Sequence, residues 1–144
     1  MERVDVFLGL GSNLGDRDLN LLRAMNLLDQ AFGMHPERIS RIVETPAWGF
    51  EGPDFLNCVV RYRTARRPET LLRICKRIER AMGRRESLEF TPDGRRIYHD
   101  RPIDIDILLY GDAVVDTLDL KIPHPLMQQR DFIMGPLGEI FEQK

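Results

Sequence analysis

The sequence predicts an α+β fold in which two helices cover one face of an antiparallel sheet. Four segments have the alternation or the apolar content of strands, and two carry apolar residues at the three- and four-residue steps of helices. Along the 144 residues their order is β-α-β-β-α-β. That order is typical of the ferredoxin-like sandwich, followed here by a short C-terminal extension.

The first strand and the first helix are predicted from the N-terminal part of the chain. Apolar residues alternate from Val4 to Leu8 and lead into the glycine-rich segment 9–16. Asp16 is a favourable helix-start residue, and the apolar residues after it recur at helical spacing as far as Gly33. The glycine-rich segment resembles a phosphate-binding turn. It lacks the Gly-Lys-Ser/Thr of a P-loop, so tight backbone geometry explains it adequately.

Two strands are predicted over 38–44 and 55–64, separated by a loop over 47–54 with two glycines and a proline. The second of these strands places alternate apolar side chains on one face: Leu56, Cys58, Val60 and Tyr62. A second helix is predicted over 68–83, because proline is favoured in a first helical turn and Gly83 can end the helix.

The C-terminal half predicts one further long strand. Residues 84–98 lack periodicity, and a strongly apolar strand follows over 103–110. Val114 and Val115 are expected to add a short edge strand, and 121–144 reads as an irregular extension. No repeat or composition shift divides the chain, so 1–144 is expected to form a single domain.

Composition excludes several protein classes. The chain is 42% hydrophobic and 31% charged, with a formal net charge of −2, and it has neither an apolar run of membrane-spanning length nor a signal-peptide pattern. We therefore expect a cytoplasmic protein that binds neither membranes nor nucleic acid. We also expect a monomer or weak dimer, which composition itself does not indicate. Residues 61–101 hold 13 of the 21 basic residues but only 6 of the 23 acidic ones, a concentration of charge that indicates an anion site.

The two cysteines, Cys58 and Cys75, lie within apolar patterns. They are interpreted as buried thiols that pack as small hydrophobic residues, because no base lies near either in the sequence.

The sharpest candidate site is the acidic pair Asp104 and Asp106 in the last long strand. Residues two apart on a strand project from the same side, roughly 6.6 Å from each other, so the two carboxylates repel unless something neutralises them. A divalent cation shared with nucleotide phosphates would do so. The alternative is an ordinary solvent-facing strand surface. The opposite side of the strand is expected to pack against the helices through Ile103, Ile105, Ile107 and Leu109.

Several other residues are candidates for phosphate binding. Arg84 and Arg101 flank the aperiodic segment, and guanidinium groups fit phosphate oxygens in a bidentate way. His124 lies between two prolines, six residues before Arg130, which suits a phosphate contact, although a buried structural histidine fits the local sequence nearly as well. Glu79, on the second helix, reads locally as a surface salt-bridge partner.

A flat heterocycle would need aromatic faces for stacking and an amide to read its edge. Trp48, Phe55 and Asn57 supply these groups around the loop 47–54, and Phe132 offers a second stacking face. The alternative is a hydrophobic cluster beneath a loop.

Together these segments resemble the 6-hydroxymethyl-7,8-dihydropterin pyrophosphokinases of folate biosynthesis. The matching motifs occur in family order over nearly the whole chain: Gly9-Leu10-Gly11-Ser12-Asn13-Leu14-Gly15, Glu44-Thr45-Pro46, Pro53-Asp54-Phe55-Leu56-Asn57, Arg77-Ile78-Glu79 with Gly83-Arg84, Arg101-Pro102-Ile103-Asp104-Ile105-Asp106-Ile107, and Pro123-His124-Pro125 with Arg130 and Phe132.

The resemblance implies transfer of the β,γ-pyrophosphoryl group of ATP to the pterin hydroxymethyl group, with release of AMP. It implies that Asp104 and Asp106 hold two Mg²⁺ ions and that Arg84 and Arg101 stabilise the developing charge. It further implies that ATP is contacted by Lys76, Glu79, Arg84, Arg101, His124 and Arg130. The pterin would be contacted by Thr45, Pro46, Trp48, Phe55, Asn57, Tyr98 and Phe132. No residue stands out as a general base, and positioning supplies much of the expected catalysis.

Two other classes of function share the predicted fold. An RNA-recognition module has the same element order, but it displays stacking aromatics on its middle strands, where this chain has Asp104 and Asp106. A non-catalytic domain that binds a small regulatory molecule would have no need of paired carboxylates beside arginines.

Overall fold

The computed structural model describes residues 2–46, 52–83, 92–93, 102–125, 127 and 130–141, with the side chains of Asp131 and Phe132 outside that description. The elements, in chain order, are β1 (Val4–Ser12), α1 (Arg17–Phe32), β2 (Arg38–Ile39), β3 (Val43–Thr45), β4 (Phe55–Thr64), α2 (Pro68–Ala81), β5 (Asp104–Tyr110), β6 (Val115–Asp116), β7 (Lys121–Ile122) and α3 (Asp131–Phe141).

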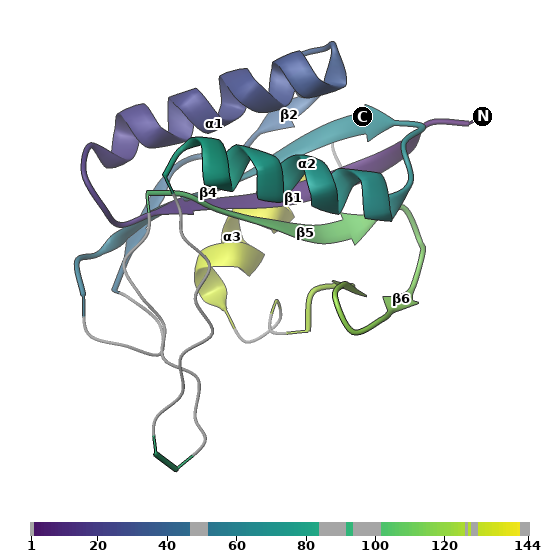
Figure 1. Ribbon diagram of the computed structural model, residues 1–144. Helices are drawn as coiled ribbons and strands as arrows, with labels where there is room; N and C mark the ends of the chain where they lie inside the picture. The colour runs from purple at the N-terminus through teal and green to yellow at the C-terminus, as the bar shows by residue number, and fades with distance from the viewer. Residues whose placement is uncertain are drawn as a thin grey trace.

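The main sheet is antiparallel, with the strand order β2-β4-β1-β5 and with β3 also paired to β4. Helices α1 and α2 lie side by side on one face, and α3 lies against the other (Figure 1). The α+β class with an antiparallel sheet is thus confirmed. The strand order is compatible with a ferredoxin-like fold.

The predicted helix ends are confirmed by their caps. The Asp16 side chain accepts a hydrogen bond from the backbone N–H of Leu19 (3.1 Å), which satisfies one of the unpaired donors at the start of α1. Gly33 ends the helix with a φ of 70°, a left-handed conformation that glycine adopts without steric cost.

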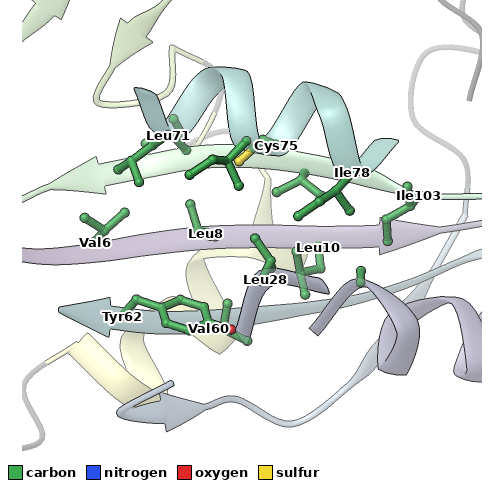
Figure 2. Packing of buried hydrophobic residues seen from close by; sticks show 14 of the residues in the cluster. Val6, Leu8, Leu10, Leu28, Val60, Tyr62, Leu71, Cys75, Ile78 and Ile103 are labelled. Carbon is green, nitrogen blue, oxygen red and sulfur yellow. The ribbon is translucent and has the colours of Figure 1, made fainter. Parts of the chain in front are cut away.

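The larger core lies between the sheet and helices α1 and α2. Strand residues such as Leu8 and Val60 meet Leu28 of α1 and Cys75 of α2, and all four are at most 1% exposed (Figure 2). The side chains predicted for one face of β4, from Leu56 to Tyr62, all belong to this core. Burial of this kind supplies most of the stability of a domain of this size.

Tyr62 combines packing with a polar contact inside this core. Its ring stacks on Phe32, with centroids 4.3 Å apart, and its hydroxyl donates a hydrogen bond to Asp29 Oδ1 (2.5 Å). The residue is fully buried, so the hydroxyl finds its partner on α1 and ties β4 to that helix.

The predicted strand over 38–44 is interrupted at Ser40, because the side chain of this residue makes one of the hydrogen bonds that a backbone group would make in a regular sheet. Its N–H donates to the carbonyl of Val59 (2.9 Å), and its hydroxyl accepts from the Val59 N–H (2.8 Å). The following residue, Arg41, donates its N–H to Glu139 of α3 (3.1 Å) instead of to a strand. The result is two short strands, β2 and β3, in place of one.

The expected alternation along β5 is wrong at Leu109. The register between β1 and β5 shifts between Phe7 and Leu8, which leaves Leu108 as an additional residue in β5. Ile103, Ile105 and Ile107 pack against the helices as predicted. Leu108 and Leu109 belong to the cluster on the opposite face.

The C-terminal extension is more regular than expected. Residues 131–141 form α3 although Pro136 lies inside the helix and Gly135 precedes it. The apolar side chains Ile133, Leu137 and Ile140 recur at helical spacing and bury against the sheet, and this packing offsets the poor helix propensity of glycine and proline. The expected strand near Val114 forms at 115–116, but it pairs with β7 in a separate two-stranded sheet.

Removal of the Tyr62 hydroxyl should destabilise the fold. We expect Tyr62→Phe to lower the free energy of unfolding by about 1.5–3 kcal/mol, since the ring stack remains while a hydrogen bond to a carboxylate is lost. Urea denaturation at constant m-value measures this. Tyr110→Phe is the matched control, because the Tyr110 hydroxyl bonds the Arg66 carbonyl (2.7 Å) in an exposed position. Equal losses in the two variants would contradict the assignment.

The two thiols should be unreactive in the native protein. Both cysteines are 1% exposed, and burial raises the pKa of Cys58 to about 12 and also raises that of Cys75. We expect an aromatic disulfide reagent at pH 8 to label neither thiol in the folded chain and both in denaturant. Rapid labelling of the folded chain would show that this part of the core opens.

Candidate active site

The sheet face opposite α1 and α2 has an apolar half and a polar half. In its apolar half, Phe7, Val59 and Leu108 are covered by α3. Further along β1, Gly11 pairs with Asn57 of β4 on one side and with Asp104 of β5 on the other. Directly paired residues of antiparallel strands project to the same face. The polar half of this face therefore presents an amide, a glycine and a carboxylate in one row.

Two glycines of β1 let neighbouring side chains pack closely over the strand on this face. A Cβ at Gly11 would come within 2.9 Å of Asn57 Oδ1 and 3.4 Å of the Phe55 ring, and one at Gly9 would meet the Leu108 side chain at 3.4 Å. Glycine in a strand interior often marks a close approach by a ligand or another backbone. Sequence reasoning treated these glycines only as part of a tight turn. Their two-residue spacing within a strand is the signal that could have identified them.

The acidic pair lies on this face as predicted. Asp104 and Asp106 are both half-buried, and they occupy positions opposite Gly11 and Gly9. Among the residues that the structure describes, no group of three or more histidine, cysteine or acidic side chains could hold a metal ion. Two carboxylates fit Mg²⁺ in particular, because this ion keeps several waters and takes phosphate oxygens as further ligands.

His124 lies beside the acidic pair. Its Nε2 is 3.9 Å from Asp106 Oδ1, and its backbone N–H donates to the carbonyl of Leu108 (3.1 Å), which places the segment after β7 along β5. Burial and the positive charge of Arg130 lower the pKa of His124, and Asp104 opposes them. The imidazole is therefore neutral at pH 7. Asp104, Asp106, His124 and Arg130 thus come together from two separate segments.

Glu79 and Lys76 approach the same strand from α2. The Glu79 carboxylate is 2% exposed and accepts a hydrogen bond from the Ile105 N–H (2.8 Å). Lys76 Nζ lies 3.9 Å from the other carboxylate oxygen. The local interpretation of Glu79 as a surface salt-bridge partner is wrong, because its side chain faces the core between α2 and β5.

The residues expected around the heterocycle gather where β1, β3 and β4 meet. Asn57 Nδ2 donates to Thr45 Oγ1 (3.0 Å), and Thr45 pairs with the half-buried Phe55 across β3 and β4. Pro46 follows Thr45 in an exposed position.

The remaining predicted contacts lie outside the part of the chain that the structure describes: Trp48, Arg84, Tyr98, Arg101 and the side chain of Phe132. Phe132 is the second residue of α3.

Two polar residues that sequence reasoning missed support the loop before Phe55. The buried Asn13 donates to the carbonyl of Pro53 (3.2 Å), and Arg17 donates to the carbonyl of Asp54 (2.9 Å) while pairing with Glu44 (2.7 Å). Their position just after β1 gave no signal beyond that of a helix start.

Comparison with known proteins agrees with this geometry. Residues 7–142 match the family described as 7,8-dihydro-6-hydroxymethylpterin-pyrophosphokinase. A 2-amino-4-hydroxy-6-hydroxymethyldihydropteridine pyrophosphokinase of Aquifex aeolicus is 44% identical over 94% of this chain and 79% of its own length. Its counterpart in Porphyromonas gingivalis is 44% identical over 94% of this chain and 89% of its own length.

Longer relatives contain the same region. A folate synthesis bifunctional protein of Pisum sativum is 39% identical over 94% of this chain, which covers 25% of that protein. Because the family match spans nearly the whole chain, the protein belongs to the 7,8-dihydro-6-hydroxymethylpterin-pyrophosphokinase family, the enzymes that transfer a pyrophosphoryl group to hydroxymethyldihydropterin in folate biosynthesis.

Proposed function

We propose that this chain carries out its family's reaction at the polar half of the sheet face. The pterin hydroxymethyl oxygen attacks the β-phosphorus of ATP, and the bond from that phosphorus to the α-phosphate oxygen breaks. The products are AMP and the pterin diphosphate, and the hydroxyl proton is released. The observation that carries the proposal is the row of Asn57, Gly11 and Asp104, which sets an amide and a carboxylate on either side of a glycine in β1.

Asp104 and Asp106 are proposed to hold two Mg²⁺ ions together with the ATP phosphates. Their hard oxygen donors and shared face fit this cation. When bound, Mg²⁺ neutralises phosphate charge and polarises the phosphoryl oxygens. Arg84 and Arg101 are proposed to stabilise the charge that develops on the leaving α-phosphate oxygen.

The nucleotide is proposed to extend from the acidic pair toward His124 and Arg130. The neutral imidazole can donate a hydrogen bond to a phosphate oxygen, and Arg130 adds a permanent positive charge beside it. Lys76 and Glu79 remain proposed ATP contacts on the α2 side. The contacts of Lys76 and Glu79 with each other and with β5 place them near the same strand.

The pterin is proposed to stack between Phe55 and Phe132, with its edge read by Asn57 and Thr45. The hydrogen bond from Asn57 to Thr45 fixes the orientation of the amide before the substrate arrives. Pro46, Trp48 and Tyr98 are proposed to complete this side.

The remaining expectations about fold, assembly and location are also part of the proposal. The fold is assigned to the ferredoxin-like class, and 1–144 to a single domain that works as a monomer or weak dimer in the cytoplasm without nucleic acid or membrane partners. Within the described residues, no helix has the length and apolar content needed to cross a bilayer.

Replacing either carboxylate should abolish turnover while the fold is retained. We expect Asp104→Asn and Asp106→Asn each to reduce AMP release from ATP, pterin and Mg²⁺ by at least about a hundredfold, because several kcal/mol of charge stabilisation is lost. Asp112→Asn, in the exposed turn after β5, is the matched control and should retain full activity. Turnover near the wild-type rate in either Asp104→Asn or Asp106→Asn would refute the metal assignment.

A methyl group at Gly11 should impair pterin use more than nucleotide binding. We expect Gly11→Ala to displace the Asn57 amide and to reduce kcat/KM for the pterin by roughly 10- to 100-fold. The affinity for α,β-methylene-ATP with Mg²⁺, measured by calorimetric titration, should change much less. Gly138→Ala is the control, since nothing lies within 4 Å of its added Cβ, and it should leave kinetics unchanged. A Gly11→Ala enzyme with normal pterin kinetics would place the pterin elsewhere.

A further inference from the structure

The Glu79 carboxylate is a charged group on the buried side of a helix. It is 2% exposed and shares the inner face of α2 with Leu71, Ile74, Cys75 and Ile78. Burial of a carboxylate costs several kcal/mol unless hydrogen bonds compensate it. The contacts that compensate it include the backbone N–H of Ile105, 2.8 Å from Glu79 Oε2, and Lys76 Nζ, 3.9 Å from Oε1.

Ile105 lies between the two residues of the acidic pair. Strand β5 begins at Asp104 and is an edge strand of the main sheet, where it pairs with β1. The first residues of a terminal strand have few backbone partners and are prone to fraying. A hydrogen bond from a charged acceptor to the amide between Asp104 and Asp106 counters this at the one place where both carboxylates are held.

The geometry also separates Glu79 from the face that the carboxylates occupy. Ile105 packs into the core with the helices, whereas Asp104 and Asp106 project to the opposite face. Glu79 therefore reaches the backbone of β5 from behind the site. Glu79 nevertheless lies close to the acidic pair, since the negative charges of Glu79 and Asp106 both raise the pKa of the Cys75 thiol.

We propose that Glu79 is a positioning residue, which fixes the backbone at Ile105 and thereby sets the spacing and direction of Asp104 and Asp106 toward Mg²⁺ and the ATP phosphates. This inference rests on the proposed function of the acidic pair. This role is an alternative to the direct ATP contact proposed for Glu79 above. Groups that orient metal ligands in this way typically change metal affinity 10- to 100-fold when removed.

The test compares two substitutions that both remove the charge, of which only one keeps an oxygen acceptor. Glu79→Gln keeps an oxygen that can accept from Ile105, whereas Glu79→Met keeps the length and loses the acceptor. We expect affinity for Mg²⁺ with α,β-methylene-ATP, measured by calorimetry, to fall roughly 10- to 100-fold in Glu79→Met and to recover largely in Glu79→Gln. Glu69→Met, at an exposed position on the same helix, is the matched control and should bind as the wild type does.

A second measurement reports directly on the hydrogen bond between Ile105 and Glu79. In ¹H–¹⁵N spectra, the Ile105 amide should lose downfield shift and exchange protection in Glu79→Met, and it should move without losing protection in Glu79→Gln. If Glu79→Met does not fold, the Glu79→Gln spectrum carries the test, and an Ile105 amide identical to that of the wild type overturns the proposal. If Glu79→Met folds and both variants lose the same metal-dependent affinity, the proposal is also overturned. The loss would then be due to the missing charge and not to the missing acceptor.

The same titrations separate this inference from the proposed function. Wild-type protein that binds the nucleotide analogue equally with Mg²⁺ and with EDTA contradicts the proposed function itself. Metal-dependent binding in the wild type that persists unchanged in Glu79→Met contradicts only the role of Glu79. Loss of affinity in EDTA as well as in Mg²⁺ would instead show a direct contact between Glu79 and the nucleotide.

Discussion

Electrostatic repulsion between two carboxylates on one strand is the constraint around which the rest of this site is arranged. Unit charges about 6.6 Å apart repel by roughly 2.5 kcal/mol at an effective dielectric constant of about 20. Asp104 and Asp106 are half-buried, so water relieves only part of this repulsion. The features that lie around the pair are a neutral imidazole, that of His124, and the cationic side chain of Arg130.

The division of one sheet face between α3 and the site explains how so small a chain can provide both a core and a binding surface. Helix α3 covers Phe7, Val59 and Leu108 and leaves the other end of the same strands open. Arg130 stands immediately before α3, so the helix that closes the second core also delivers a positive charge to the edge of the site. The helix that stabilises this face therefore directly follows one of the proposed ATP contacts.

Much of the fold could be predicted from the sequence because local and tertiary preferences agree there. Helix α1 has a capping aspartate and a terminal glycine, and the bounds of β4 follow directly from its alternation. The apolar spacing of α1 places its buried face only in part, since Leu28 and Phe32 are buried whereas Leu19 and Leu22 are exposed. Three features depend on contacts distant in sequence, and periodicity could not reveal them. The bulge at Leu108 arises from the register between β5 and β1. The break at Ser40 arises because its hydroxyl, in place of a backbone carbonyl, accepts the hydrogen bond from Val59. Helix α3 forms because burial of its apolar side chains outweighs the poor helix propensity of Gly135 and Pro136.

The candidate site shows the same limit. The position of the acidic pair on one face follows from strand geometry alone. The sequence could not indicate that Glu79 turns inward to Ile105, because its neighbours Lys76 and Arg80 are those of a solvated helix surface. Nor could it show that Gly9 and Gly11 lie opposite Asp106 and Asp104, since that pairing joins segments almost a hundred residues apart.

The interruption at Ser40 has a consequence for how the molecule behaves in a crowded solution. Free strand edges invite pairing with other chains, and an uninterrupted edge is the usual template for fibrous assembly. Here the outer strands β2 and β3 are two and three residues long, and the turn between them is bound to Glu139. At this edge a foreign strand would find only fragments of a ladder to extend, so the break that spoils the regularity of the sheet also protects this edge from pairing with other chains.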